Sequence, residues 1–491
     1  MDWNELYKKL DQQVREGHFE SAKAELIEIK SGELPREMIE HFADLCRRVR
    51  LDSWGLHLLR PIIRPKHPIH PEPNTGEWTM YAALLIKIGA LDEAFEILEE
   101  QSEASHPSVL LYSAFAYFAR WDYQASSEKL IQYVNLPKLD DYKLAVATVN
   151  LVGSLVYLEK YSEALTYLNA LIPRCERNQW KLLLGNCFEI SAQISIQLGQ
   201  WGQAEGQLKK AQALISGHHQ YELFIEKHFA KLKLLKNPTD SASRAGLIQV
   251  REKALMVNEW ETVRDCDRIA GEICNDAELS RRVFFGTPFE SYKNRLESYF
   301  RNSNAETGES YLWLLNDVAS KNIFDMNSLS TETSDRLKHG QLVHRLLSVL
   351  TSDFYQSFTI GTLFSKLFPD EYYNHETAPD RVFQAVRTLR TWFQKSSIPI
   401  EIQSEKNQYR LIGLEPCAIR VYKEKKIVSS DEFYLSQIRQ EFLLGEFSSG
   451  QASEVTGLSP TAVRLVLKRA LASNFLWING KGRSTTYKFI S

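Results

Sequence analysis

Apolar residues recur at helical spacing over most of residues 1–320. Small residues also recur at regular places, and the clearest pairs are Ala82 with Ala94 and Ala192 with Ala204. A small residue at a crossing lets two helices approach closely. An amphipathic hairpin buries its apolar stripe by stacking against the next hairpin. The pattern therefore predicts a continuous right-handed superhelix of antiparallel helix pairs over residues 1–320.

One copy of the repeat has large, small and turn residues in a fixed order, at Trp78, Tyr81, Ala82, Leu85, Gly89, Ala94 and Leu98. This copy resembles the tetratricopeptide repeat (TPR). The small positions of the second helices are centred on Ala22, Gly55, Ala94, Ala125, Ala164 and Ala204. Their intervals scatter around the TPR period of about 34 residues, so the repeats are divergent. The resemblance implies a TPR-like α-solenoid with a protein or peptide partner in its groove.

The character of the chain changes near residue 323, where short extended segments and basic helices replace the long amphipathic pairs. Three helices and then two short strands are predicted, at residues 341–351, 360–367, 379–393, 399–402 and 409–412. In the third helix, Val382, Val386, Leu389 and Phe393 recur at helical spacing and face the core. Three helices followed by a β-hairpin predict a winged helix over residues 323–414.

Two motifs of this module are Gln384-Ala385-Val386-Arg387-Thr388-Leu389-Arg390 and Tyr409-Arg410-Leu411. They resemble the recognition helix and wing of response-regulator (OmpR/PhoB-type) winged helices, which also occur in bacterial transcriptional regulators with TPR-like domains. That resemblance implies a third helix in the major groove of DNA and a wing at the minor groove. The chain departs from the family, whose wing normally carries Gly-x-Gly-Tyr, because the residues here are Asn407-Gln408-Tyr409. The winged helix also follows the repeats here, whereas it usually precedes them.

A second module is predicted over residues 433–491, after a linker at residues 415–432. Its helices are expected at residues 435–447, at residues 450–456 and from Pro460, which Ser459 caps. A hairpin follows, with the tip Asn479-Gly480-Lys481-Gly482-Arg483-Ser484. Small residues, a turn glycine and branched apolar residues stand where a helix-turn-helix needs them, at Ala452, Ser453, Gly457, Val463 and Val466. The module resembles a generic bacterial winged helix. The predicted fold class is therefore mainly α, a TPR-like solenoid followed by two small α+β winged-helix domains.

Charge is distributed unevenly along the chain. Residues 336–491 carry 21 Lys and Arg against 14 Asp and Glu, whereas the whole chain has a net charge of −3. A basic end is typical of a nucleic-acid-binding surface. Outward guanidinium, amide and hydroxyl groups can reach base edges or phosphates. The candidate DNA contacts are Arg381, Gln384, Arg387, Thr388, Thr391 and Arg410 in the first module, and Thr461, Arg464, Lys468, Lys481 and Arg483 in the second.

Each of these features also has a purely structural interpretation. Arg387 and Arg390 can pair with local carboxylates such as Asp380, and the Gly-Lys-Gly-Arg tip can be an ordinary solvated turn. Winged helices also serve as protein-docking modules. The charge asymmetry by itself can be a solvated surface without function.

Neither an enzyme nor a metal protein is expected. The sequence contains no phosphate-binding glycine loop, dinucleotide fingerprint, zinc-protease motif or nucleophile elbow, and no cofactor is predicted. His67 and His70 are a close histidine pair, but they lie in a proline-rich connector without a nearby thiol or carboxylate cluster. The six cysteines are scattered and are expected to be reduced core residues. An acidic N-terminus and the lack of a long apolar run predict a cytoplasmic protein.

The leading hypothesis is a transcription regulator that binds double-stranded DNA through residues 323–491 and a partner through its solenoid. The alternative is a non-enzymatic scaffold subunit of the PCI type, in which helical repeats precede a winged helix that binds other subunits. Outward Arg and Lys on both third helices favour DNA, because assembly modules tend to present apolar surfaces.

Overall fold

The computed structural model describes residues 2–15, 18–67, 70–103, 106–215, 219–303, 306–316, 318, 320–331, 337–423, 430–443, 445–480 and 485–490. The chain divides into two compact units. The first contains Met1–Gly308, Ser352–Phe383 and Gln403–Arg410. The second contains Glu309–Thr351, Gln384–Ile402 and Leu411–Ser491. Among the described residues, no helix is both long and apolar enough to cross a membrane.

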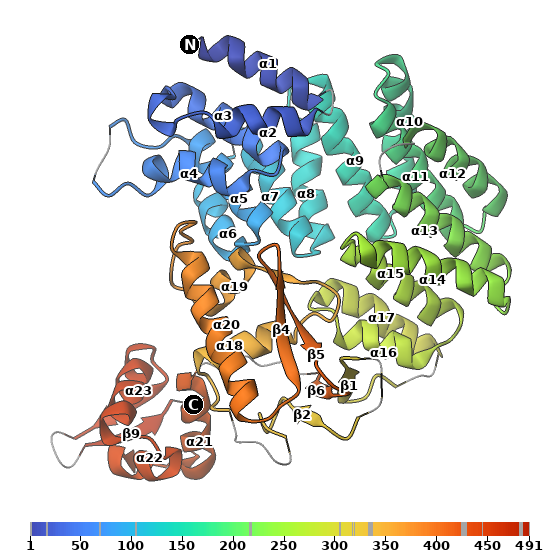
Figure 1. Cartoon of the computed structure of the whole chain (residues 1–491). Coiled ribbons are helices and arrows are strands. Elements are labelled where there is room, and N and C mark those ends of the chain that lie inside the picture. The colour runs from blue at the N-terminus through green and yellow to red at the C-terminus, as the bar shows by residue number, and fades with distance from the viewer. Residues whose placement is uncertain are drawn as a thin grey trace. The chain divides into compact units, whose positions relative to one another are not determined.

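Successive helices of the first unit pair as hairpins and form a helical-repeat solenoid (Figure 1). The pairs are α1 (Trp3–Arg15) with α2 (Phe19–Ile27), α3 (Arg36–Arg48) with α4 (Asp52–Ile63), α5 (Thr75–Ile88) with α6 (Leu91–Glu100), α7 (Ser108–Ala119) with α8 (Tyr123–Val134), α9 (Asp141–Tyr157) with α10 (Tyr161–Arg177), α11 (Lys181–Gln197) with α12 (Trp201–Ile215), α13 (His219–Lys236) with α14 (Ser241–Met256), and α15 (Trp260–Ile273) with α16 (Ala277–Phe285). A short 3₁₀ helix, η1 (Ser31–Glu33), precedes α3, and α17 (Glu290–Ser303) ends the array.

The small residues of the two clearest repeat pairs are buried as the pattern predicts. Ala82, Ala94, Ala192 and Ala204 are all 0% exposed. A Cβ at Gly55 would lie 2.9 Å from the methyl groups of Leu84 on the next helix and 3.3 Å from the Cβ of Cys46, so a larger residue at this crossing requires its neighbours to shift. The fold is therefore mainly α and TPR-like over the hairpins.

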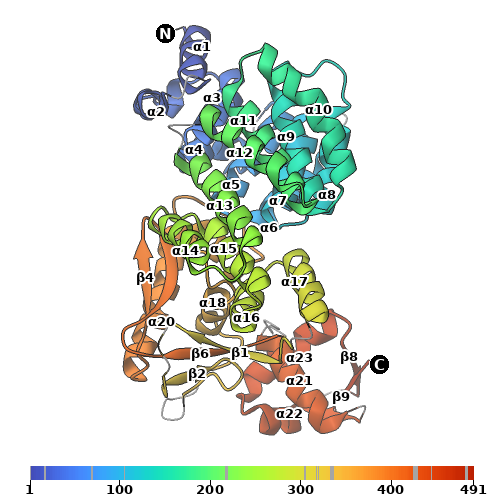
Figure 2. The same cartoon turned by 90° about the vertical axis from the view of Figure 1, so that its right-hand side faces the viewer.

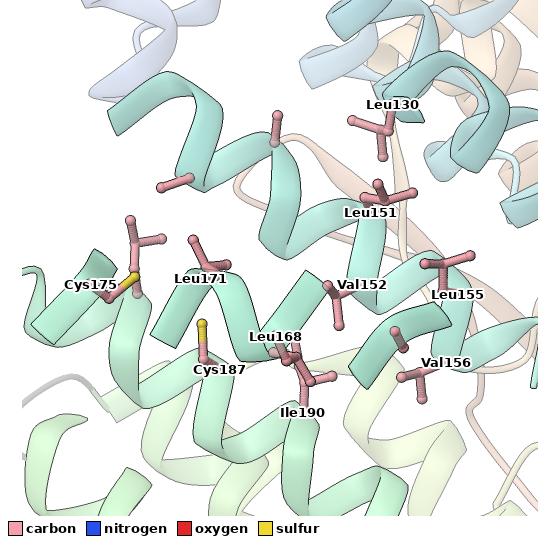
Figure 3. Close-up of a cluster of buried hydrophobic side chains, with 14 of the residues drawn as sticks. Leu130, Leu151, Val152, Leu155, Val156, Leu168, Leu171, Cys175, Cys187 and Ile190 are labelled. Atoms are coloured by element: carbon pink, nitrogen blue, oxygen red, sulfur yellow. The ribbon is translucent and has the colours of Figure 1, made fainter. Parts of the chain in front are cut away.

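Leucines and two thiols fill the core between α9, α10 and α11 (Figure 3). Leu151 and Leu155 come from α9, Leu168 from α10 and Ile190 from α11, and each is at most 7% exposed. The six cysteines are free thiols, and all except Cys274 are buried. The five buried thiols therefore act as small apolar core residues, as the sequence predicted.

The repeat register in α8 differs from the prediction by one residue. Ala125 is half-buried, whereas Ser126 is 0% exposed. The Asp122 side chain caps the helix by accepting the Ala125 N–H, so α8 begins at Tyr123. Buried Tyr123 then sets an inward stripe that contains Ser126, Ser127 and Leu130.

A small sheet combines segments that the sequence assigned to the solenoid, to the start of the first winged helix and to the linker. Its strand order is β1 (Ser310–Leu314), β6 (Ala418–Tyr422), β2 (Ile323–Asp325), and Figure 2 shows the three strands side by side. The described helices of the solenoid thus end at Ser303, not at residue 320, and part of the predicted linker at 415–432 is the central strand. Alternate burial of Tyr311 and Trp313 on β1 shows why a strand forms there.

The remaining elements form two α+β modules with the same order. The first has α18 (Leu342–Leu350), β3 (Phe358–Thr359), α19 (Ile360–Leu367), α20 (Ala378–Lys395), β4 (Ile400–Glu405) and β5 (Gln408–Gly413). The second has α21 (Ser430–Phe442), β7 (Phe447–Ser448), α22 (Ser449–Thr456), α23 (Pro460–Ala472), β8 (Leu476–Asn479) and β9 (Thr486–Phe489). The strand orders are β3-β5-β4 and β7-β9-β8. In both sheets the last strand therefore lies in the middle.

Two local details differ from the sequence expectation. The first helix of the second module ends at Phe442, because Leu443 adopts a positive φ, and Phe447 belongs to a strand. The turn between β4 and β5 lacks the family's glycines, but Lys406 and Asn407 take positive φ angles of 48° and 63°. Positive φ at both central residues is the requirement of a type I′ hairpin, so the turn is tight without glycine.

Candidate functional site

The exposed face of α20 carries most of the predicted DNA contacts of the first module. Gln384, Arg387, Thr388 and Thr391 are exposed, at the i, i+3, i+4 and i+7 positions of one stripe. The apolar residues of the opposite face are buried, with Val382, Val386 and Leu389 at 0% exposure. The hydroxyls of Thr388 and Thr391 donate to carbonyls one turn earlier in the helix. Their oxygens can still accept a hydrogen bond from solvent or ligand.

Arginines 387 and 390 do not form the carboxylate pairs considered from the sequence. Arg390 donates to the backbone carbonyl of Ile402, with Nε at 3.0 Å. Arg387 has no ion pair within the part of the chain that the structure describes. Its guanidinium is therefore available to an external acceptor.

Arg381, another predicted contact, has partners inside the chain. Both of its terminal nitrogens donate to the Glu371 carboxylate, one of them at 2.8 Å. Its guanidinium also lies 3.8 Å from the ring centroid of Phe368. The hydrogen bond from Arg381 keeps the pKa of Glu371 below its ordinary value. Arg381 thus supports the turn between α19 and α20, and its charge is already paired.

Arg410 is also engaged within the first unit. It donates to the side-chain oxygen of Gln403 at 2.7 Å, and its guanidinium lies 5.8 Å from the centroid of the Trp260 ring. Together these residues line a cavity of about 100 Å³ that also includes Lys406 at the hairpin turn. Lys406 is exposed, and it is a cation at this turn that the sequence analysis did not select.

The third helix of the second module presents its predicted polar face. Ser459 caps α23 by accepting the Ala462 N–H at 3.3 Å, with Pro460 at the first position. Thr461, Arg464 and Lys468 are exposed, whereas Val463 and Leu467 belong to the buried core of this module. The predicted contacts Lys481 and Arg483 lie outside the described residues.

Apolar side chains are also exposed in this second module. Phe475, Trp477, Ile478 and Ile490 are 57%, 53%, 45% and 48% exposed. They lie on or beside β8, one of the two edge strands of its sheet. Exposed aromatic and branched side chains at one edge favour contact with a protein.

The solenoid contains a charged cluster that periodicity alone did not reveal. Lys227 of α13 donates to Asp265 of α15 at 2.8 Å, and Asp265 also pairs with Arg268 at 3.1 Å. Burial raises the pKa of Asp265. The positive charges of Lys227 and Arg268 have the larger opposite effect, so the pKa of Asp265 lies well below its usual range. Burial and the positive charge of Arg268 lower the pKa of the nearby half-buried Lys231 to about 8. Shifted pKa values of this kind gather at functional sites as well as in structural ion pairs.

A second group of contacts joins α19 and its flanking segments to the α5–α6 hairpin of the solenoid. The Thr359 hydroxyl donates to the Ile88 carbonyl at 2.6 Å, and the Tyr373 N–H donates to Glu93 at 2.6 Å. Lys366 pairs with Asp92 at 3.0 Å. A Cβ at Gly361 would lie 2.3 Å from the Ile88 carbonyl oxygen, so the backbones touch. The segment from Thr359 to Tyr373, which precedes α20, therefore packs against the solenoid.

A buried ion pair extends this attachment to α15. Arg264 and Asp353 are 1% and 2% exposed at their side chains and lie 2.5 Å apart. Asp353 also accepts the N–H groups of Tyr355 and Gln356 at 2.8 and 3.0 Å. Removing one member of such a pair leaves an uncompensated charge in the interior.

No protein-family model matches the chain, and no curated protein matches it. Among solved structures, the chain is similar to a Rap protein complexed with Competence and Sporulation Factor. The TM-score is 0.43 at 12% identity, over 62% of this chain and 91% of that chain. At this TM-score the similarity carries no argument about the function of the chain.

Proposed function

We propose that the protein is a DNA-binding transcriptional regulator in which both α+β modules are winged helices. The observation that carries this proposal is the repeated architecture. Each module has a helix, a strand, two helices and two strands, with the last strand central, and each third helix exposes Arg or Lys beside Thr. In this arrangement α20 and α23 act as the recognition helices.

The exposed stripe of α20 has the length and chemistry to read bases. From Gln384 to Thr391 it extends roughly 10 Å along the helix, about the rise of three base pairs. Arg387 stands in the middle of the stripe and offers two parallel donors to a guanine, while Gln384 suits an adenine. Arg464 and Lys468, one turn apart on α23, add charge for phosphates or bases.

The solenoid is the proposed site for a protein or peptide partner. The cluster at Lys227, Lys231 and Asp265 offers charges of both signs in a partly dehydrated setting, where ionic contacts are stronger than in water. We propose no catalytic role, and we propose that the protein is cytoplasmic.

The proposal is tested on the full-length chain by selecting sites from random duplex DNA and measuring affinity against salt concentration. We expect a steep fall in affinity as salt rises, because contacts to phosphate release counterions. Arg387→Ala should weaken the preferred site by roughly 5- to 150-fold and relax the preference at one base pair. Arg177→Ala is the matched control, because it removes one positive charge from an exposed position on α10. Absent or salt-independent binding contradicts the proposal.

The exposed apolar side chains at β8 favour a second candidate, a scaffold subunit whose last module docks onto another protein. Trp477→Ser combined with Ile478→Ser removes that apolar edge and leaves the face of α23 intact. This candidate is correct if the double variant loses a co-purifying protein complex and neither wild type nor variant binds DNA. If Arg387→Ala loses DNA binding and the double variant keeps it, the proposal of a transcriptional regulator is supported.

A further inference from the structure

Two histidines that are 318 residues apart in the sequence face each other in the first unit. His57 lies on α4, and His375 lies in the loop between α19 and α20. The Nδ1 atom of His57 is 3.3 Å from the Nε2 atom of His375. The carboxylate of Glu376 completes the group, because one ligand atom from each of the three residues lies within 4.8 Å of the others.

The spacing of these nitrogens fits a tetrahedral metal ion. Two nitrogens at 2.0–2.1 Å from one tetrahedral zinc ion are roughly 3.3–3.4 Å apart. Glu376 is exposed, so its side chain has room to swing the remaining distance toward the histidines. Two imidazoles and a carboxylate are a donor set that zinc accepts, with water as the fourth ligand. A pocket of about 520 Å³, lined by residues that include Asp52, His57 and His375, gives water access.

The surroundings hold both rings in place. The indole of Trp54 stacks on the His57 ring at 4.8 Å with an interplanar angle of 12°. The Tyr373 N–H binds Glu93, and the Glu376 N–H donates to the Asn374 side chain at 3.0 Å, so the loop that carries His375 is anchored.

We propose that His57, His375 and Glu376 bind one divalent ion of the zinc class and thereby link α4 of the solenoid to the loop that leads into α20. The inference does not depend on DNA binding. The bound ion would add a metal-dependent link between this segment and the solenoid, beside the contacts of Thr359, Tyr373 and Lys366. The sequence contains no metal-binding motif at this place.

The test uses the full-length chain stripped of metal and titrated with Co²⁺, whose visible absorption reports four-coordinate binding. We expect one equivalent to bind and Zn²⁺ to displace it. His57→Gln, His375→Gln and Glu376→Gln should each weaken binding at least about tenfold, since loss of a supporting outer-shell group alone has an effect of that size. A double variant, His67→Gln with His70→Gln, is the matched control and should bind as the wild type does.

Folding is checked separately by circular dichroism of each metal-free variant. Glu376→Gln changes an exposed side chain and should fold as the wild type, so it keeps the test valid if a histidine variant unfolds. The proposal is overturned if the wild type gives no cobalt absorption, because the 3.3 Å contact is then only a hydrogen bond. It is also overturned if binding survives in Glu376→Gln and His57→Gln, or if it is lost only in the His67/His70 variant.

Discussion

His344 shows how a single buried residue makes stability depend on pH. Its ring is 5% exposed, and its Nδ1 atom accepts the Gly340 N–H at 2.9 Å. Burial, and then the nearby His339, lower the pKa of His344 from 6.5 to about 4. Only the neutral ring can accept at Nδ1, so the folded state excludes the proton.

We predict that His344 makes the protein less stable as the pH falls from about 6.5 to about 4. In this window the unfolded chain binds a proton that the folded chain excludes, which shifts the equilibrium toward unfolding by up to roughly 3 kcal/mol. Denaturant unfolding at several pH values should show a shallower loss for His344→Gln than for the wild type. The carboxylates that titrate in the same range cancel in this difference. Equal slopes would mean that His344 takes up its proton without cost.

The candidate arginines show what residue type alone can and cannot predict. Helical spacing correctly placed Arg387, Arg464 and Lys468 on exposed faces, because burial of the apolar stripe determines the outward side. The same spacing selected Arg381, whose partner Glu371 lies in the preceding turn, and Arg410, which packs beside Trp260. The sequence pattern does not show which residues lie close together in space. The proposed metal ligands His57 and His375 were missed for the same reason, because they are 318 residues apart.

At the scale of one helix pair, the small residue at each crossing sets the separation of the two helices. Ala204 of α12 and Ala192 of α11 belong to one buried core, and both are 0% exposed. We predict that Ala204→Phe destabilises the chain by roughly 1–3 kcal/mol, because a large side chain forces the helices apart. Gln203→Phe, at the exposed neighbouring position, is the control. Equal thermal midpoints for the two variants in calorimetry would contradict the predicted repeat register.

Elements with a local apolar pattern were predictable, and a sheet that joins distant segments was not. The helices of the solenoid and α19, α20 and α23 follow from apolar spacing. The sheet of β1, β6 and β2 does not, because β1 pairs with a strand about 100 residues away and β2 is three residues long. In α8, a cap at Asp122 moved the register by one residue, which the irregular repeat intervals did not reveal.

At the scale of the whole chain, domain boundaries read from sequence do not match the compact units. The sequence predicted a separate module at residues 323–414. In the structure, Ser352–Phe383 and Gln403–Arg410 belong to the same unit as the solenoid. The contacts responsible join residues more than 270 positions apart, such as Thr359 with Ile88 and Tyr373 with Glu93. Local composition does not encode such long-range pairing.

This organisation predicts a difference between the full chain and the fragment of residues 323–491. In the fragment, Asp353 loses Arg264, and Thr359 and Tyr373 lose their solenoid partners. We expect amides of β3 and α19 to exchange hydrogen faster in the fragment, because local opening exposes a surface that the solenoid covers. Amides of α23 should keep their protection, since its buried residues pack within the second module. Hydrogen exchange followed by mass spectrometry measures both regions in one experiment. Unchanged protection of α19 would contradict this prediction and show that the first module folds without the solenoid.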